Sequence, residues 1–533
     1  MNKNIFIGGA WPYGNYFMHI GHLVALLPAD VIARYHRLNG DNVIYVSGTD
    51  CHGTPITQRA KREGKKPAEI ALYYHNEFVK TFRALNFQYN LYTATATEYH
   101  KRRVQELFKQ IYNNGYIYEK EVMQDYCEHC GEYLADREIQ GECVHCGTLT
   151  NADQCDGCLR ELDASQLKNK ICKSCKHSLI QKPNKHLYFK LSAFQNQLQE
   201  LINKNADKWR TNAVNESNKY LEQGLQDRAV TRQLNWGVPV PVEGFNDKRL
   251  YVWIEAVLGY LTAGEQVATE NGADFNHYVK NSRAKLYFVH GKDNIVFHTI
   301  IFPSLLLALN AGYMLPTNIV SCEFMNMNEE KMSKSKGNLV TANELLSKYS
   351  ADSIRYYFCL NNPERKDANF SDADFIATHN KHLCGGLGNF VNRNLSFLIK
   401  KFGGNLPQGE IDQNVQEYVQ NAYALIGDLI DEGEIKSATV KIYEYISYCN
   451  KYYDSSEPWV SAKAEDLTKF NNTTATCLYL ISNMANLINP IMPETADKIR
   501  EMLDLEDASW HEIFCNKTHI NNAPILFNKI EDK

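Results

Sequence analysis

The stretch "KMSKSKGN", residues 331–338, concentrates hydrogen-bond donors in a short segment. Its lysines supply ammonium groups, and Ser333 and Ser335 add hydroxyls. An ammonium neutralises negative charge as a point charge, without the fixed fork of an arginine. The segment therefore fits an anion whose charge shifts during a reaction, although a lysine-rich octet by itself is more typical of a solvated surface loop.

A second candidate site lies near the N-terminus, in "WPYGNYFMHIGH", residues 11–22. His19 and His22 are three positions apart at the start of an apolar-periodic segment, so both rings face one side of a helix. There they can donate to phosphate oxygens, where the helix dipole also favours negative charge. Two histidines at this spacing are more often ordinary surface or core residues, so the pair gains meaning only beside another motif.

Eight of the fifteen cysteines form four C-x-x-C pairs in the middle of the chain. The pairs are Cys127 with Cys130, Cys143 with Cys146, Cys155 with Cys158, and Cys172 with Cys175. Two such pairs can bind one tetrahedral Zn²⁺, so we expect one or two structural zinc ions rather than redox dithiols or chance clustering. We interpret His129, His145 and His177 as bystanders, and most of the other cysteines as small buried residues.

The segments around these motifs predict the elements that position them. "IFIGGA" is expected to be a strand, "HLVALLPADVIARYHRLNG" a helix that stops at Gly40, and "NVIYVSGTD" a second strand. This βαβ unit begins a doubly wound parallel sheet, whose ligands bind beyond the carboxyl ends of the strands. Residues 11–22 occupy that place, and the chain has no P-loop motif to hold phosphates. From about Lys381 long helical periodicity, without glycine after Gly433, predicts a helix bundle.

Length and charge set the remaining limits. A chain of 533 residues is too long for one ordinary core, so several domains are expected. The net charge of -5 does not by itself suggest nucleic acid, so any polyanion must bind to local patches. The first residues lack a secretory signal, which favours a cytoplasmic protein. The apolar stretch from Ile295 to Leu315 contains His298 and Pro303 and predicts a buried helix rather than a membrane span.

"HIGH" near the N-terminus and "KMSKS" some three hundred residues later are the two signatures of the class I aminoacyl-tRNA synthetases, and the chain resembles the methionyl-tRNA synthetase family most. Further segments similar to that family occur in the same order over nearly the whole chain: "PYGN", "SGTDCHGTPI", "DRAVTRQLNWGVPVP", "YVWIEAVLGY", "HGKDNIVFH" and "EPWV". The resemblance implies an α/β fold with a doubly wound, Rossmann-like parallel sheet split by a zinc-knuckle insertion and followed by a C-terminal α-helical bundle. It also implies that methionine and ATP form methionyl-adenylate and pyrophosphate, after which the methionyl group passes to tRNA.

Site residues are implied position by position. Catalytic roles fall to His19, His22, Lys331 and Lys334. ATP binding falls to Gly21, Gly291, Lys292, Asp293, Ser333 and Ser335. Methionine binding falls to Trp11, Tyr13, Asp50, Trp253, Tyr260, Phe297, His298 and Phe302, with Asp50 taking the α-ammonium. Mg²⁺ is expected to be held mainly by ATP phosphates and waters.

The resemblance also implies how zinc and tRNA are bound. The inner pairs (Cys143, Cys146, Cys155 and Cys158) would share one zinc, and the outer pairs (Cys127, Cys130, Cys172 and Cys175) another. Asn389, Arg393 and Trp459 would read the anticodon. The expected domains are a first catalytic half at 1–115, the insertion at 116–228, a second catalytic half at 229–321, a KMSKS and stem-contact region at 322–380, and the anticodon-binding bundle at 381–533.

Three positions depart from the family's usual pattern: Trp11 stands where many relatives have leucine, and Tyr16 and Glu329 stand where glycine is common. Their effect on the methionine pocket and the loops is open. Two alternative functions also stay open, namely a class I synthetase for another amino acid and a zinc-bearing RNA-binding protein without catalysis. A monomer without membrane attachment is expected, since no appended dimerisation domain is apparent after the bundle.

Overall fold

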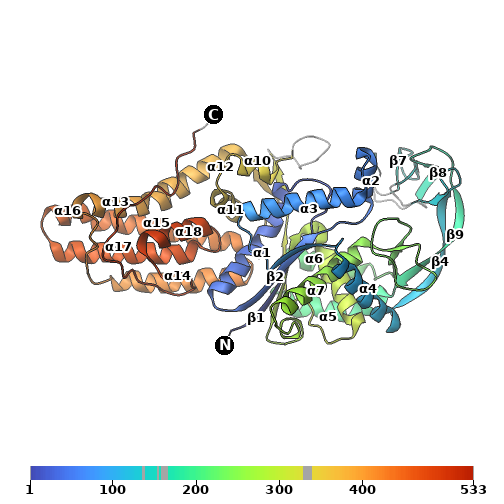
Figure 1. Cartoon of the computed structure of the whole chain (residues 1–533), viewed down its shortest axis with the longest axis horizontal. Coiled ribbons are helices and arrows are strands. Elements are labelled where there is room, and N and C mark those ends of the chain that lie inside the picture. Colours follow the sequence, from blue (N-terminus) through green and yellow to red (C-terminus); the bar gives the residue numbers. More distant parts are fainter. Residues whose placement is uncertain are drawn as a thin grey trace.

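The computed structural model of the chain describes residues 2–134, 138–152, 155, 157, 166–327 and 339–531. A parallel sheet with its helices lies in the middle of an elongated molecule, the cysteine-rich insertion lies at one end, and a helix bundle lies at the other (Figure 1). The expected fold class, an α/β domain split by an insertion and followed by helices, is therefore confirmed.

The central sheet has five strands, all parallel, in the order β14-β13-β1-β2-β3. Their bounds are β1 Asn4–Gly9, β2 Asn42–Thr49, β3 Leu91–Ala94, β13 Lys285–Gly291 and β14 Asn318–Cys322. From β1 the chain extends the sheet to one side with β2 and β3, and after the insertion to the other side with β13 and β14. The order therefore reverses between β1 and β13, which is where a doubly wound sheet opens its ligand crevice.

The two faces of this sheet belong to different hydrophobic cores because successive side chains of a strand point to opposite sides. Ile5 and Ile7 of β1 pack into a core that continues through α1 into the C-terminal bundle. Phe6 between them packs into the other core, together with α4, α7 and α9. The helices around the sheet are α1 Ile20–Leu38, α2 Thr54–Glu63, α3 Pro67–Ala84, α4 Glu98–Asn113, α7 Val252–Glu270, α8 Asn276–Val279 and α9 Phe302–Leu309.

The insertion is built on a long antiparallel ribbon of β4 and β9, paired from Ile117↔Phe189 to Tyr126↔Ile180. A four-stranded and a three-stranded sheet result, in the orders β10-β9-β4-β5 and β7-β6-β8. The elements are β4 Ile117–Cys127, β5 Glu132–Tyr133, β6 Ile139–Cys143, β7 Leu149–Asn151, β8 Leu167–Cys172, β9 Ile180–Phe189, α5 Gln195–Asn205, α6 Thr211–Glu222 and β10 Arg228–Ala229, followed by the β11–β12 pair, Thr231–Arg232 with Arg249–Leu250.

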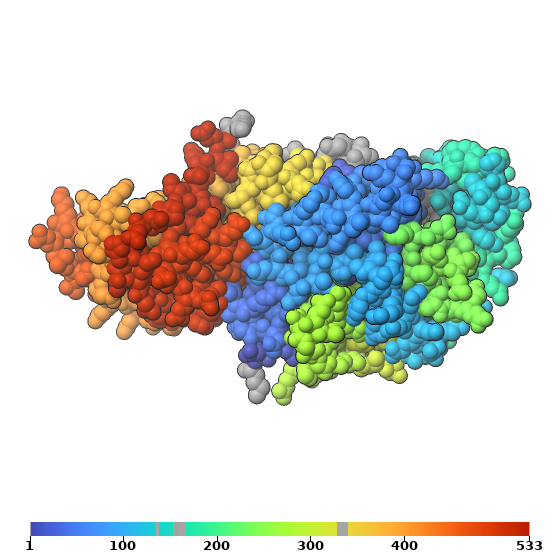
Figure 2. All heavy atoms as spheres, viewed as in Figure 1, coloured from blue at the N-terminus to red at the C-terminus, as the bar shows by residue number. Residues whose placement is uncertain are grey.

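A short connecting region precedes the bundle: β15 Met325–Met327, α10 Ala342–Leu346, α11 Ala351–Leu360, β16 Ala368–Phe370 and α12 Asp372–Thr378. The bundle consists of a π-helix His379–Gly388, α13 Asn389–Phe402, α14 Gln413–Asp431, α15 Ile435–Ser456, α16 Pro458–Lys463, α17 Leu467–Ile488 and α18 Pro493–Leu503. Arg355 of α11 joins the bundle to the α/β fold, because this fully buried guanidinium donates to Asp30 of α1 at 2.7 Å and to the Ile491 carbonyl at 2.8 Å. The space-filling view shows the bundle in direct contact with the N-terminal part (Figure 2).

The apolar stretch at 295–315 lies in the protein core, as expected, but it is not helical to its end. A π-helix Phe297–Ile301 runs into α9, which stops at Leu309 because Asn310 adopts a left-handed conformation with φ 48°. By length and composition alone, one segment of the described residues, Lys292–Leu309, could cross a membrane. Since 67% of that segment is buried within the protein, it also fits an ordinary core helix.

Candidate active site

A cavity of about 600 Å³ opens where the strand order reverses. Ala10, which follows β1, and Gly291, which ends β13, both line it, so the cavity lies beyond the carboxyl ends of adjacent parallel strands. The residues that sequence analysis singled out and that line it are Trp11, Tyr13, His19, Gly21, His22, Asp50, Trp253, Tyr260, Gly291, Asp293, Phe297 and His298. Segments far apart in the chain thus meet around one space.

Phe302 is a predicted methionine-binding residue that does not line this cavity. Its side chain is 1% exposed, and its ring lies 5.7 Å from that of Tyr260, edge to face. Phe302 therefore supports the wall of the cavity from behind rather than forming its surface.

The two histidines of "HIGH" cap helix α1. His19 is the N-cap, and its Nδ1 accepts from the Gly21 amide at 3.2 Å, while Nδ1 of His22 accepts from the His19 amide at 3.4 Å. The rings stack with centroids 3.8 Å apart. Because each Nδ1 accepts a hydrogen bond, each neutral ring carries its proton on Nε2. The capping arrangement therefore selects the tautomer whose Nε2–H can donate to an anion.

Asp50 is a carboxylate held in a fixed, buried position. The backbone around it is pinned, since the Asp50 amide donates to the Pro12 carbonyl at 2.9 Å and the Gly14 amide donates to the Asp50 carbonyl at 2.8 Å. Its side chain is 3% exposed and accepts from the His52 amide at 3.2 Å. Burial, and then the nearby Glu255 carboxylate, raise the pKa of Asp50 well above its usual value. A bound cation at this position would stabilise the ionised form.

A second buried pair joins Tyr260 of α7 to His298. His298 Nδ1 lies 2.8 Å from the Asn294 carbonyl, which can only accept, so Nδ1 carries the proton and Nε2 accepts from the Tyr260 hydroxyl at 2.8 Å. Burial lowers the pKa of His298 to about 4. The ring is therefore neutral at physiological pH, and the two side chains form an uncharged, oriented wall.

Another part of the cavity wall is formed by aromatic side chains. The Trp253 indole N–H donates to the Tyr13 hydroxyl, and the Trp253 ring meets the Phe297 ring edge to face with centroids 4.0 Å apart. Such contacts hold each ring in one orientation. The three side chains come from separate elements, so the tertiary fold alone brings them together.

Trp11 fills a slot that two glycines create. A Cβ on Gly48 of β2 would lie 2.4 Å from the indole ring, and a Cβ on Gly259 of α7 would lie 2.8 Å from its other edge. The ring also meets Tyr260 edge to face, with centroids 6.3 Å apart. Its buried N–H has no hydrogen-bond partner among the residues that the structure describes. Trp11 therefore takes up cavity space that a smaller residue would leave open.

Lys292 lies between Gly291 and Asp293, which line the cavity, but does not itself line it. Its Nζ is 2.6 Å from a Glu323 carboxylate oxygen and 2.9 Å from one of Asp367, and it lies 3.9 Å from the centroid of the Phe324 ring. Glu323 itself lines the cavity, as does Asp293. Lys292 is thus held by two carboxylates in this arrangement.

Lys331, Ser333, Lys334 and Ser335 lie outside the described residues, but both flanks of their segment are placed. Met325 and Leu339 line the cavity. The chain after the segment pairs with the "HIGH" region, because the Ile20 amide donates to the Val340 carbonyl at 3.1 Å. The described chain that follows this segment therefore lies beside the "HIGH" motif.

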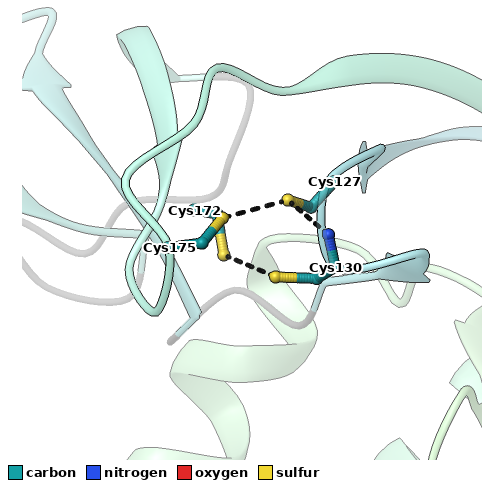
Figure 3. Close-up of side chains that lie close together, drawn as sticks. All are labelled: Cys127, Cys130, Cys172 and Cys175. Atoms are coloured by element: carbon teal, nitrogen blue, oxygen red, sulfur yellow. Dashed lines mark hydrogen bonds between the residues drawn. The ribbon is translucent and has the colours of Figure 1, made fainter.

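The outer cysteine pairs form one compact cluster, shown in Figure 3. Sγ of Cys127 lies 3.4 Å from Sγ of Cys175, and Sγ of Cys130 lies 3.8 Å from Sγ of Cys172. All four sulfur atoms lie within 4.8 Å of one another. A tetrahedral Zn²⁺ with bonds of about 2.3 Å has sulfur–sulfur edges of about 3.8 Å, so this donor set fits such an ion.

The same turn shapes each of the three knuckles that the structure describes in full. In the first two, Gly131 and Gly147 follow the second cysteine with φ 71° and 75°. In the Cys172–Cys175 knuckle, Lys176 adopts φ 63°, and its amide donates to the Cys172 carbonyl at 2.8 Å. The two glycine amides donate in the same way to the carbonyl of the first cysteine of their pairs. The left-handed turn therefore forms even where sequence offers no glycine, at a modest conformational cost.

The inner pairs begin a second cluster. Cys143, Cys146 and Cys155 lie within 4.8 Å of one another, with Sγ of Cys146 3.4 Å from Sγ of Cys155. Cys158, the fourth predicted ligand, lies outside the described residues. His129 and His177 stack on each other near Cys175, with ring centroids 4.1 Å apart. Both cysteine groups could hold a metal ion.

Comparison with known proteins agrees with this geometry. The family of tRNA synthetases class I (M) matches residues 5–395, and the anticodon binding domain of methionyl tRNA ligase matches residues 403–533. The chain belongs to the class I methionyl-tRNA synthetase family. The methionine–tRNA ligase of Bacillus cereus (strain 03BB102) is 43% identical over 99% of this chain and 97% of its own length. The corresponding ligase 1 of Alkaliphilus oremlandii is 42% identical over 99% and 98%.

A solved member of the family resembles the whole chain. The Mycobacterium tuberculosis methionyl-tRNA synthetase, in complex with methionyl-adenylate, superimposes with a TM-score of 0.81 at 25% identity and covers 99% of this chain and 100% of its own. The resemblance to the methionyl-tRNA synthetase family drawn from sequence motifs is thereby confirmed.

Two of the predicted anticodon residues of this synthetase-family chain, Arg393 and Trp459, contact one tyrosine of the bundle. Asn389 starts α13, and Arg393 follows one turn later. The Arg393 guanidinium stacks 4.7 Å over the Tyr453 ring and bonds to Asp454 at 2.8 Å. Trp459, which is 38% exposed, lies 5.5 Å from the same Tyr453 ring. Arg393 and Trp459, which are 66 residues apart in the sequence, therefore lie on one surface of the bundle.

Several cavity residues of this synthetase-family chain were not predicted from sequence. Among the cavity residues, the polar side chains of Asn15 and Glu323 were not predicted. In the bundle, Tyr453 and Asp454, which contact Arg393, were not predicted either. Asn15 lies inside the quoted motif "PYGN", so the motif itself was a usable signal. Glu323, Tyr453 and Asp454 carry no local pattern, because their importance arises only from packing against segments far away in the chain.

Proposed function

We propose that this chain activates methionine with ATP to form methionyl-adenylate and pyrophosphate, and then transfers the methionyl group to its tRNA. The observation that carries the proposal is the single cavity at the strand switch point, which joins a buried carboxylate and aromatic walls to a histidine-capped helix N-terminus. Relatives named methionine–tRNA ligase span the whole chain, and a solved relative holds methionyl-adenylate. The proposed enzyme is therefore a methionine–tRNA ligase.

Methionine would bind at what we call the amino-acid end of the cavity, formed by Trp11, Asp50, Trp253, Tyr260 and His298, with Tyr13 and Phe297 beside them. The α-ammonium would pair with Asp50, a buried carboxylate in need of a cation. The thioether would contact aromatic edges, a favourable arrangement for polarizable sulfur. Phe302 would act indirectly, by supporting Tyr260.

ATP would bind at the nucleotide end, formed by His19, Gly21, His22, Gly291, Lys292 and Asp293. The methionine carboxylate would attack the α-phosphorus in line while negative charge grows on the leaving pyrophosphate. Nε2–H groups of the histidines would donate to phosphate oxygens at the positive end of the α1 dipole. Lys331 and Lys334 would neutralise pyrophosphate from the other side, with Ser333 and Ser335 donating hydrogen bonds. Mg²⁺ would be held mainly by phosphates and water.

Structural zinc is the ion that best fits the cysteine clusters. Eight thiolates could hold two ions, the outer ion by Cys127, Cys130, Cys172 and Cys175, and the inner by Cys143, Cys146, Cys155 and Cys158. Four thiolates leave no open position on an ion, so zinc would order the insertion rather than activate water. This small region has few apolar side chains of its own, and half of its buried cluster is cysteine.

The anticodon of the tRNA would bind at Asn389, Arg393 and Trp459. Unpaired loop bases are recognised by stacking and by hydrogen bonds to their edges, which an exposed tryptophan, a stacked arginine and an asparagine can supply. We also propose the domain division 1–115, 116–228, 229–321, 322–380 and 381–533. We also propose that the chain acts as a monomer in the cytoplasm, without membrane attachment.

ATP–pyrophosphate exchange by the purified, zinc-loaded protein, with Mg²⁺, one amino acid at a time and no tRNA, tests the proposal. Exchange with methionine alone would support both the chemistry and the amino-acid end. Exchange with a different amino acid would keep the reaction class but discard the assigned pocket. Absence of exchange from folded protein would exclude activation and favour an RNA-binding role without catalysis.

A further inference from the structure

A basic segment lies beside the cavity mouth. The end of α2 and the turn after it read "RAKREGKK", residues 59–66, with five basic residues and one acidic residue in a chain whose net charge is -5. Lys61 and Arg62 are exposed and have no ion pair with any described residue. Glu63, the acidic member, is shared by Arg59 at 2.7 Å and Lys65 at 3.1 Å. The segment therefore presents uncompensated positive charge.

Aromatic side chains adjoin this charge. Tyr73 on α3 is 51% exposed, and its ring meets that of Phe17 edge to face with centroids 6.3 Å apart. Tyr16 and Tyr74 also meet Phe17 edge to face, with centroids 5.8 Å and 5.4 Å away. Leu72, beside Tyr73, is 61% exposed. An exposed aromatic held by a cluster of other rings is a stable stacking platform.

Arg59 connects charge, rings and cavity. Its guanidinium lies 4.7 Å over the Tyr74 ring and 5.6 Å from the Tyr16 centroid. One of its terminal nitrogens donates to the Asn15 carbonyl at 2.6 Å, and Asn15 lines the cavity. We call Tyr16, Phe17, Lys61, Arg62 and Tyr73 the rim surface. Lys61 and Arg62 belong to α2 and Tyr73 to α3, and these two helices lie between the bundle and the insertion (Figure 1).

We propose that the rim surface docks the single-stranded 3′ end of the tRNA as that end enters the cavity, an inference that rests on the function proposed above. Unpaired nucleotides are bound by aromatic rings, which stack on bases, and by lysine and arginine, which contact phosphates. The rim surface offers both within one patch that is continuous with the cavity. Tyr73 stacks a base, and Lys61 and Arg62 contact the phosphates next to it.

Two variants test this docking: Tyr73→Ala, and Lys61→Ala with Arg62→Ala. None of these residues lines the cavity, so methionine-dependent pyrophosphate exchange without tRNA is expected to stay at the wild-type rate. The KM for tRNA in aminoacylation is expected to rise about tenfold for Tyr73→Ala, the loss of one stacked base. Removal of Lys61 and Arg62 is expected to weaken the salt dependence of tRNA binding. The slope of log K against log salt concentration should become about 1.4 less negative.

A shortened tRNA separates the 3′ end from the rest of the molecule. Transcripts of the methionine tRNA, intact and without the unpaired 3′ nucleotides, are bound to wild-type and variant protein. The variants are expected to weaken binding of the intact transcript only. An equal loss for both transcripts would place the contact on the duplex or elsewhere and overturn the proposal, as would no loss at all.

Matched controls exclude general charge and exposure effects. Lys204→Ala with Lys208→Ala removes the same charge from exposed positions at and after the end of α5, below the sheet in Figure 1 while α2 lies above it. Phe514→Ala removes an aromatic side chain that is 47% exposed. Both controls are expected to leave tRNA binding unchanged. Equal loss in the controls, or a rim surface that binds a protein and leaves aminoacylation unaffected, would also overturn the proposal. Failure of exchange in the wild type would instead contradict the proposed function.

Discussion

The two ends of the cavity are built in different ways. At the amino-acid end, Asp50, Tyr260 and His298 are buried, and side chains contact one another, as in the Tyr260–His298 pair at 2.8 Å and the Trp11 ring between Gly48 and Gly259. At the nucleotide end, the groups are charged or near the surface, as in Lys292, which lies between Glu323 and Asp367. One end is shaped by packing and the other by electrostatics.

This difference predicts which property of the enzyme a substitution at each end of the cavity will change. A packed, water-poor end discriminates by shape and by buried charge, so changes there alter affinity and specificity for the amino acid. An end that stabilises growing charge acts on the rate of the chemical step. The following predictions test this contrast, from the largest expected effect to the smallest.

Asp50→Asn is expected to have the largest effect. The change keeps the shape of the side chain but removes the charge that pairs with the α-ammonium in a buried site, which costs about 2–5 kcal/mol. The KM for methionine in pyrophosphate exchange should rise by about 10² to 10³, with little change in the KM for ATP. The control is Asp41→Asn. The Asp41 carboxylate does not line the cavity, and one of its oxygens lies 2.8 Å from Nδ1 of His36. An unchanged KM for methionine would remove Asp50 from the binding site.

His22→Ala is expected to lower kcat of exchange by about 10² because one donor to developing charge is lost. His22→Gln separates this role from capping, since glutamine at the third helical position can still accept from the His19 amide. Both variants should lose rate at the nucleotide end while the KM for methionine stays near its normal value. Recovery of the rate in His22→Gln would mean that a capping amide suffices at this position and that the imidazole is not required.

Gly259→Ala is expected to destabilise the protein by about 1–3 kcal/mol, because the new Cβ would lie 2.8 Å from the Trp11 indole and its three nearest atoms all belong to that ring. In a Trp11→Leu background the same change should cost much less, since the slot is no longer filled. Denaturant unfolding of the four proteins in this cycle measures the coupling. Equal costs in both backgrounds would show that Trp11 does not define the slot.

Glu323→Gln is expected to have the smallest effect. The Lys292–Glu323 pair is partly exposed, at 26% and 15%, and such pairs contribute about 0.2–1 kcal/mol. Release of Lys292 toward the nucleotide should lower the KM for ATP by about 1.4- to 5-fold at low salt. The difference should shrink at high salt because screening weakens the pair. A change in the KM for methionine instead would contradict the separation of the two ends.

Sequence alone predicted the elements with strong local signals. The β1–α1–β2 unit follows its apolar periodicity, and α1 ends at Leu38, two residues before Gly40. The knuckle spacing likewise predicted two cysteine groups, since ligand geometry depends on short separations within each pair. The helix expected to reach Leu315 was too long, because periodicity does not show that Asn310 adopts a left-handed conformation.

The sequence by itself determined the fold class, the family and the motifs that meet at the cavity, because these depend on local patterns. Only the tertiary structure decided that Gly48 and Gly259 make room for Trp11 and that Phe302 stands behind Tyr260. It also decided that Lys292 is held by Glu323 and Asp367. Each of these depends on the distance between residues far apart in the chain, and that distance is set by the packing of helices on the sheet.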